Sequence, residues 1–243
     1  MRVLRRRTGS WISGLLCAGL IALAPAAAAE EAGPPLPPPR PDRPKADPPD
    51  DRKAQSEPPM KPVADSAQES CADRLAKLGV RFETKPAVQE NACNVEDPVL
   101  VSELPDGLAV SSPALMTCLA AESLARWARD VLVPEADRHL QSRPTKILIG
   151  TSYQCRDQRS GGRPSEHAFG NAVDVMGFEF AKREPLAIKP HPEDSPEAAF
   201  QSAVQKGACP IFTTVLGPGS DADHDDHLHL DMRARKGDYR ICQ

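Results

Sequence analysis

The sequence lacks several features that would each have pointed to a definite class of protein. Its formal net charge is −4 at pH 7, so it has no basic excess, which argues against binding of nucleic acids or of anionic membranes. No apolar stretch is long and symmetrical enough for a transmembrane helix. Internal repeats are also absent, and so are CxxC and CxH pairs, which argues against a metal site built from thiolates.

The first 29 residues are predicted to form a secretory signal peptide. They begin with clustered arginines, continue with a short apolar run from Trp11 to Leu23, and end in small residues at Ala27–Ala29. We therefore expect residues 1–29 to be removed and the protein to be exported, to the periplasm in the simplest case. After cleavage we expect no stable membrane insertion.

Residues 30–66 are predicted to be a disordered linker. Twelve of the 26 prolines lie between Pro34 and Pro62, and this stretch has almost no large apolar residue from which a core could form. The linker is either a tether that lets the remaining chain search an extended target or a leader without a specific role. Beyond it the composition is that of a globular protein, and we predict one folded domain over residues 67–243.

The predicted domain contains an even number of cysteines, which in an exported protein favours disulfide bonds. The six are Cys71, Cys93, Cys118, Cys155, Cys209 and Cys242. Sequence does not select the pairing. Our expectation is Cys71–Cys93 and Cys209–Cys242, because each bond would hold one end of the domain, with Cys118–Cys155 remaining.

Two helices are predicted from their starting residues. Ser112-Pro113 is typical of a helix start, and apolar residues including Leu124 and Trp127 follow at helical spacing, which indicates a helix packed on the core. Trp127 is interpreted as a packing residue. Ser195-Pro196 predicts the start of a second helix, which Gly207 would end.

Three short strands are also predicted, and they suggest an α+β fold. Residues 146–149 form a buried run, whereas 171–178 and 227–232 alternate, so that apolar side chains can face the core and chemically active ones a cleft. Because helices and strands do not alternate regularly along the chain, we expect an antiparallel sheet flanked by helices.

The alternating strands carry a candidate zinc site. Zinc hydrolases use three imidazole or carboxylate ligands and leave a fourth position open, and His167, Asp174 and His229 can supply such a set. His227 lies two residues before His229, so both imidazoles project from the same face of a strand. One can bind Zn²⁺ while the other handles a proton. Asp231 on that face is a candidate partner for an imidazole.

The same residues resemble known families. The pattern SxHxxGxAxD from Ser165 to Asp174, with a downstream HxH, is similar to the zinc peptidase superfamily of lysostaphin-type, D-Ala-D-Ala and hedgehog-related domains. The pattern HxxHxH from His224 to His229 resembles the penicillin-insensitive murein endopeptidases. The domain as a whole resembles the bacterial extensin-like C-terminal family. These resemblances imply a small antiparallel sheet around one zinc ion.

Residue roles follow from the resemblance. It implies that His227 is catalytic, that His224 is an additional histidine of the endopeptidase type, and that Arg156 binds a substrate carboxylate. Many related carboxypeptidases place Glu three residues before the last ligand, where this chain has Asp226. Because of that difference, a histidine is expected to act as the catalytic base in place of a glutamate.

The expected function is therefore that of a secreted zinc metallopeptidase. As a monomer it would hydrolyse peptide cross-links of peptidoglycan, of D,D or L,D type, with stem peptides as its partners and no nucleic acid. Two alternatives stay open. One is a D,D-carboxypeptidase that trims D-Ala, and the other is a noncatalytic wall-binding domain with a structural metal.

Overall fold

A nine-stranded mixed sheet forms the centre of the part described by the computed structural model, residues 69–159 and 161–243. The predicted signal peptide and linker lie outside the described residues. The helices are α1 (Cys71–Lys77), α2 (Cys118–Trp127), α3 (Val133–Leu140) and α4 (Pro196–Ala208), with short 3-10 turns at η1 (Pro105–Gly107), η3 (Glu166–Phe169) and η4 (Lys236–Asp238) and a π-helical stretch, η2 (Ala128–Leu132). The strands are β1 (Arg81–Thr84), β2 (Val88–Glu90), β3 (Cys93–Val95), β4 (Val99–Leu104), β5 (Leu108–Met116), β6 (Pro144–Thr151), β7 (Ala172–Phe180), β8 (Leu186–Ala187), β9 (Thr214–Leu216), β10 (Leu228–Asp231) and β11 (Ile241–Cys242).

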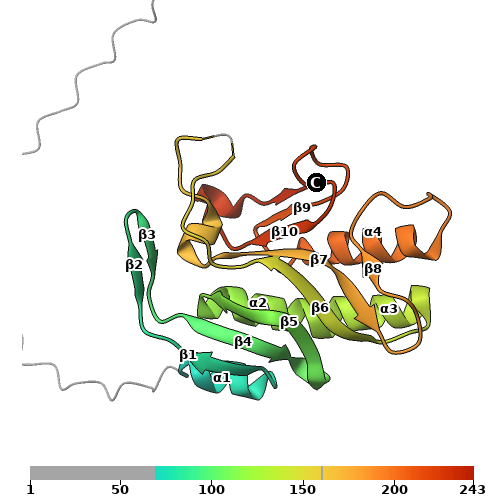
Figure 1. Ribbon diagram of the computed structural model, residues 1–243, viewed down its shortest axis with the longest axis horizontal. Coiled ribbons are helices and arrows are strands. Elements are labelled where there is room, and N and C mark those ends of the chain that lie inside the picture. The colour runs from blue at the N-terminus through green and yellow to red at the C-terminus, as the bar shows by residue number, and fades with distance from the viewer. Residues whose placement is uncertain (1–68, 160) are drawn as a thin grey trace, which may run out of the picture. The chain divides into compact units, whose positions relative to one another are not determined.

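The sheet is larger and less regular than the small antiparallel sheet expected from the sequence. Its order is β1-β4-β5-β6-β7-β10-β9-β11, with β8 beside β7, and the β5–β6 and β9–β11 pairs are parallel. The β2–β3 hairpin forms a separate ribbon that projects from the sheet (Figure 1). The α+β class is confirmed, but "small" and "antiparallel" are wrong, since both ends of the sheet gain strands that carry no strong alternation in the sequence.

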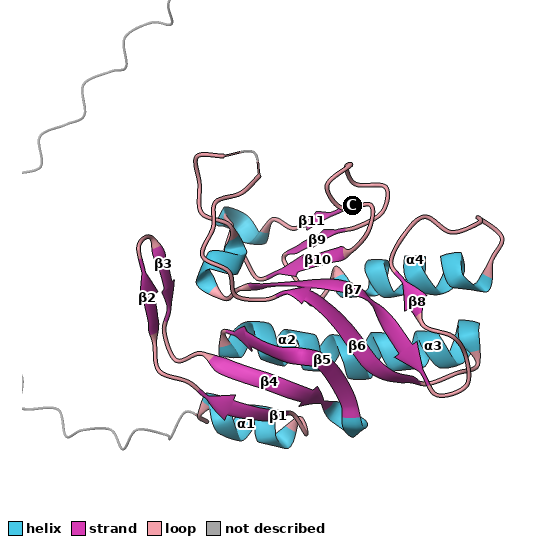
Figure 2. Cartoon of the chain, in the orientation of Figure 1, coloured by secondary structure: helices cyan, strands magenta, loops and turns pink. Residues whose placement is uncertain are grey.

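Helices α2, α3 and α4 cover one face of the sheet and bury the core (Figure 2). Phe178 of β7 lies at its centre, with ring centroids 5.5 Å from Phe200 of α4 and 6.3 Å from Trp127 of α2. Trp127 is fully buried and donates a hydrogen bond to the Val204 carbonyl, 3.0 Å away, which joins α2 to α4. Its interpretation as a packing residue is confirmed.

The predicted helix start at Ser112-Pro113 is wrong. These residues lie in β5, and α2 begins only at Cys118, where the Thr117 hydroxyl accepts a hydrogen bond from the amide of Ala120. The pairing of β5 with β4 is irregular opposite Val101–Glu103, next to Ser112 and Pro113. Because proline has no N–H to donate to a neighbouring strand, such an irregularity is where a sheet accepts it.

The second predicted helix and the three predicted strands are present. Helix α4 starts after Ser195, whose hydroxyl caps it, and ends at Ala208, one residue beyond Gly207. In β7 and β10 the apolar set, such as Val173 and Leu230, is buried on the helix side. Across the described residues, every helix is too short or too polar to cross a membrane.

Two glycines of the central strands differ in what an added Cβ would contact. We therefore expect their substitution by alanine to destabilise the fold to different degrees. A Cβ at Gly177 of β7 would collide with the backbone of β8 at the Leu186 carbonyl, which cannot move away. A Cβ at Gly150 of β6 would instead meet the flexible end of Met176, 2.7 Å from its Sδ. We predict that Gly177→Ala lowers the free energy of unfolding by about 2 kcal/mol and Gly150→Ala by clearly less, as measured by urea denaturation. Equal losses would contradict this packing argument.

Candidate metal centre

The first predicted ligand, His167, is positioned by the short turn η3. Ser165 caps the turn by accepting a hydrogen bond from the His167 amide at 3.4 Å, and Gly170 ends it with φ at 63°. A Cβ at Gly170 would lie 3.0 Å from the side chain of Val95 and 3.3 Å from the amide of Thr117. Both the backbone conformation and the packing therefore require glycine, and the turn presents His167 to the start of β7.

The other two predicted ligands face each other on neighbouring strands. Asp174 of β7 is the direct partner of His229 in the antiparallel pairing with β10. Directly paired residues carry their side chains on the same face of a sheet, close enough for contact. The register of β7 and β10 therefore brings together two residues that are 55 positions apart in the sequence.

The three side chains converge on one point. Asp174 Oδ1 lies 3.1 Å from His167 Nε2 and 3.0 Å from His229 Nδ1, and the two nitrogens are 3.3 Å apart. His167 and Asp174 are buried, and His229 is nearly so. A tetrahedral zinc ion with bonds of about 2.0–2.1 Å separates its ligand atoms by roughly 3.3 Å. The geometry therefore fits a zinc ion, and imidazole with carboxylate is a donor set that zinc accepts.

The imidazoles of His167 and His229 are each held by a hydrogen bond from the ring nitrogen that points away from Asp174. His167 Nδ1 donates to the Ser152 carbonyl at 2.6 Å, and His229 Nε2 donates to the Asp231 carboxylate at 3.1 Å. Because a carbonyl and a carboxylate only accept, those nitrogens carry the hydrogen. In the neutral ring the other nitrogen then turns its lone pair toward the converging point, as a metal ligand must.

Two further histidines stand beside the ligands. His227 Nε2 lies 3.7 Å from Asp174 Oδ1, while its Nδ1 donates to the Asp226 carboxylate at 2.7 Å. His224 donates from Nδ1 to Asp221 at 2.7 Å, and its ring centroid is 5.2 Å from that of His227. The structure thus gathers both predicted catalytic histidines with the predicted ligands, and it assigns an outer carboxylate to each.

The charges in this cluster are strongly coupled. Burial by itself would raise the pKa of Asp174, but hydrogen bonds and positive charge from His167 and His229 hold it well below its usual range. Burial would lower the pKa of His229, but the carboxylates of Asp174 and Asp231 outweigh it and raise this pKa to about 9. Without a metal, the proton on His229 thus neutralises part of the negative charge.

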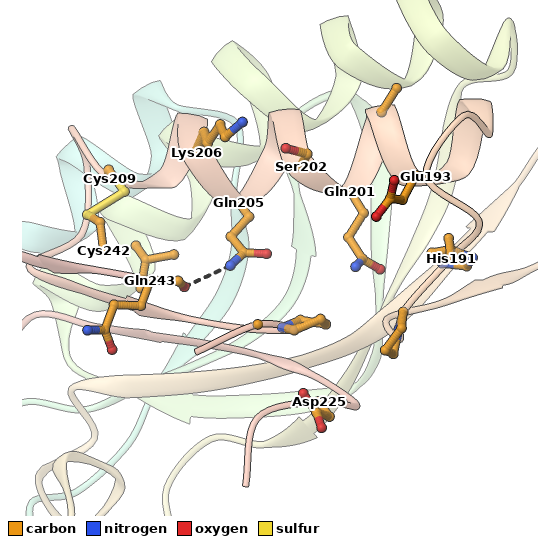
Figure 3. A pocket seen from close by; sticks show the side chains of 16 residues that line it. His191, Glu193, Gln201, Ser202, Gln205, Lys206, Cys209, Asp225, Cys242 and Gln243 are labelled. Carbon is orange, nitrogen blue, oxygen red and sulfur yellow. Dashed lines mark hydrogen bonds between the residues drawn. A yellow bond between two sulfur atoms is a disulfide. The ribbon is translucent and has the colours of Figure 1, made fainter. Parts of the chain in front are cut away.

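A cavity of about 730 Å³ opens onto the cluster. Arg156, which was predicted to bind a substrate carboxylate, lines it and donates to the side chain of Gln154 at 2.9 Å and to the Asp157 carbonyl at 3.3 Å. A larger hollow of about 900 Å³ runs along α4 (Figure 3). None of the predicted ligands or catalytic residues lines that hollow, so the smaller cavity is the candidate site.

One disulfide bond lies next to the metal cavity and a second lines the larger hollow. Cys93–Cys155 attaches the β2–β3 hairpin to the segment that contains Ser152 and Arg156, and Cys209–Cys242 joins the end of α4 to β11 (Figure 3). The remaining bond is Cys71–Cys118, between α1 and α2. The expected Cys209–Cys242 pair is confirmed, whereas the Cys71–Cys93 and Cys118–Cys155 pairs are wrong. Cys93 belongs to a hairpin that folds toward the site and away from α1.

Sequence reasoning missed the Ser152 carbonyl and the contact between Asp226 and His227. A backbone carbonyl leaves no trace in side-chain patterns, so no signal could have identified the first. Asp226 did stand out, but only as a replacement for a glutamate. Its direct neighbour in the sequence, His227, was the available signal, since an adjacent carboxylate is a common partner of a catalytic imidazole.

The fold and the cluster together define a disulfide-bonded α+β domain with a His/Asp/His group that could bind a metal ion. The family model described as extensin-like protein C-terminus matches residues 69–243, and the chain belongs to this family. No curated protein and no solved structure matches the chain.

The outer hydrogen bonds predict a selective effect on metal binding. Asp231→Asn removes the charge that orients His229 and should weaken zinc binding by about tenfold or more. The matched control is Asp226→Asn, which should leave zinc affinity unchanged because His227 is not a ligand. Competition with a chromogenic chelator measures both. Equal effects of the two substitutions would contradict the assignment of ligands.

Zinc binding should also release protons. With a pKa of about 9, His229 is protonated at neutral pH in the metal-free protein, and zinc must displace that proton. We predict that about one proton leaves His229 per zinc at pH 7, and that this contribution disappears above about pH 9, where the ring is already neutral. Calorimetry in buffers of different ionisation enthalpy measures the release. Because a zinc-bound water with a pKa of about 7 releases a proton of its own, the release is compared between about pH 8 and about pH 10, where that water is largely ionised. An equal release at both pH values would contradict the prediction.

Proposed function

We propose that this protein is a secreted, periplasmic zinc metallopeptidase that hydrolyses peptide cross-links of peptidoglycan. The observation that carries the proposal is the convergence of three ligand atoms within 3.0–3.3 Å of one another, with His227 Nε2 beside them. A structural metal would need the ligands but not a further imidazole facing the same point. The proposal follows the resemblance of the motifs to zinc peptidases.

When bound by His167, Asp174 and His229, zinc would supply a Lewis acid for the peptide carbonyl and lower the pKa of a water molecule to about 7. His227 would accept the proton of the attacking water at Nε2, because Asp226 holds its Nδ1–H and leaves Nε2 as the acceptor. The same imidazole would then return the proton to the leaving amine. His224, whose Nδ1 donates to Asp221, would stabilise negative charge at the carbonyl oxygen in its doubly protonated form, in which Nε2–H is the donor.

Cleavage of a cross-link is favoured over trimming of terminal D-Ala. Asp226 occupies the place of the glutamate found in many related carboxypeptidases, but its carboxylate is directed to the His227 imidazole. The proton acceptor of this site is therefore a histidine, as in the endopeptidases that the HxxHxH pattern resembles. Arg156 would hold a substrate carboxylate at the cavity wall.

Digestion of purified sacculi tests the proposal. The zinc-loaded protein is expected to convert cross-linked dimers to monomers, and His227→Gln should slow this at least about hundredfold while zinc stays bound. His229→Ala is expected to lose both zinc and activity. Shortened monomers with intact dimers would instead identify a carboxypeptidase. Zinc binding without any product would overturn the enzyme and favour a wall-binding domain.

A further inference from the structure

The arginines that line the metal cavity are not equivalent. Arg159 forms an ion pair with Asp223 at 2.9 Å, and the guanidinium of Arg233 lies 3.7 Å from Glu166. Arg156 and Arg235 also line the cavity, but among residues 69–159 and 161–243 neither forms an ion pair with a carboxylate. Two of the four guanidinium groups therefore keep their positive charge uncompensated at close range.

The guanidinium of Arg235 is held in place by neutral acceptors. It donates to the Thr213 carbonyl at 2.9 Å and to the Thr214 hydroxyl at 2.6 Å, and the residue is half-buried. A guanidinium has five N–H donors, and these two bonds leave others for a ligand. Because the side chain is already fixed, binding an anion would cost little further conformational entropy.

Arg235 and Arg156 belong to segments that flank the strands of the metal ligands in the order of the sheet. Arg156 follows β6, whereas Arg235 is bound to β9, and the sheet order between them is β6-β7-β10-β9. The ligands Asp174 and His229 belong to the two middle strands. With strands about 4.8 Å apart, the two outer strands are separated by roughly 14 Å, the length of a few residues of extended peptide.

We propose that Arg235 is a second carboxylate-binding residue of this cavity, so that the preferred substrate carries one carboxylate on each side of the scissile bond. This inference rests on the proposed function and narrows its substrate class to acidic, branched cross-links. A carboxypeptidase substrate needs only one such contact, next to its C-terminal residue. A fork-shaped guanidinium binds a carboxylate through two parallel hydrogen bonds, which gives the second contact its selectivity.

Arg240 provides a matched control. Like Arg235 it donates only to neutral oxygens among the described residues, the Cys209 carbonyl at 3.1 Å and the Phe212 carbonyl at 2.7 Å. Like Arg235 it ties down the C-terminal segment, but it does not line the metal cavity. A structural role of these arginines should appear in both variants, whereas carboxylate binding should appear only at Arg235.

The test compares two forms of one ligand. A cross-linked muropeptide dimer with free diaminopimelate carboxyls and the same dimer with those carboxyls amidated are titrated into the protein, with a chelator present to prevent cleavage. We expect the wild type to prefer the free acid. This preference should fall about tenfold in Arg235→Gln and remain in Arg240→Gln, and Arg235→Lys should fall in between because it keeps charge without the fork. Thermal unfolding monitors the fold of each variant.

Three outcomes would overturn the inference. They are equal binding of both dimers by the wild type, an undiminished preference in Arg235→Gln, and an equal loss in Arg240→Gln. Repeating the titration with zinc restored separates this inference from the proposed function. If the free acid is preferred but no cleaved product forms, the carboxylate site stands and the peptidase proposal fails. If cleavage occurs but the free acid is not preferred, the peptidase proposal stands and the carboxylate site at Arg235 fails.

Discussion

The centre of this protein depends on three electron-pair donors being held within contact of one another. His167, Asp174 and His229 each point a nitrogen or oxygen at the same spot, at separations of 3.0–3.3 Å. Such atoms repel one another unless a cation lies between them, and in the metal-free protein a proton on His229 serves that purpose. The surrounding fold keeps the arrangement assembled, so that the metal ion proposed for this site would meet preorganised ligands.

That preorganisation is distributed over distant parts of the chain. The pairing of β7 with β10 places Asp174 against His229, and η3 delivers His167 through a turn that only Gly170 can close. The Ser152 carbonyl that orients His167 lies in a segment tied to the β2–β3 hairpin by Cys93–Cys155. Hairpin, turn and sheet therefore act on one site although they come from separate parts of the sequence.

The hydrogen-bond acceptor bound by each histidine determines which of its ring nitrogens keeps a free lone pair. His167 and His229 turn a lone pair toward the converging point, whereas His227, bound to Asp226, keeps an accepting nitrogen beside it. Membership in the extensin-like C-terminal family does not by itself establish a chemical activity. The peptidase proposal therefore derives from this geometry and from the resemblance of the motifs, and the proposal of an acidic substrate derives from Arg156 and Arg235.

Features that depend on near neighbours in the chain could be predicted from the sequence. Alternation located β7 and β10, Ser195 marked the start of α4, and spacing nominated the residues that the fold gathers. The fold was needed to establish the size of the sheet, the start of α2 after Thr117, two of the three disulfide pairs, and the carbonyl that orients His167. The reason is physical. Caps and periodicity act within a few residues, whereas strand register, a strand irregularity beside Pro113 and a hairpin folding toward the site depend on which distant backbones pair.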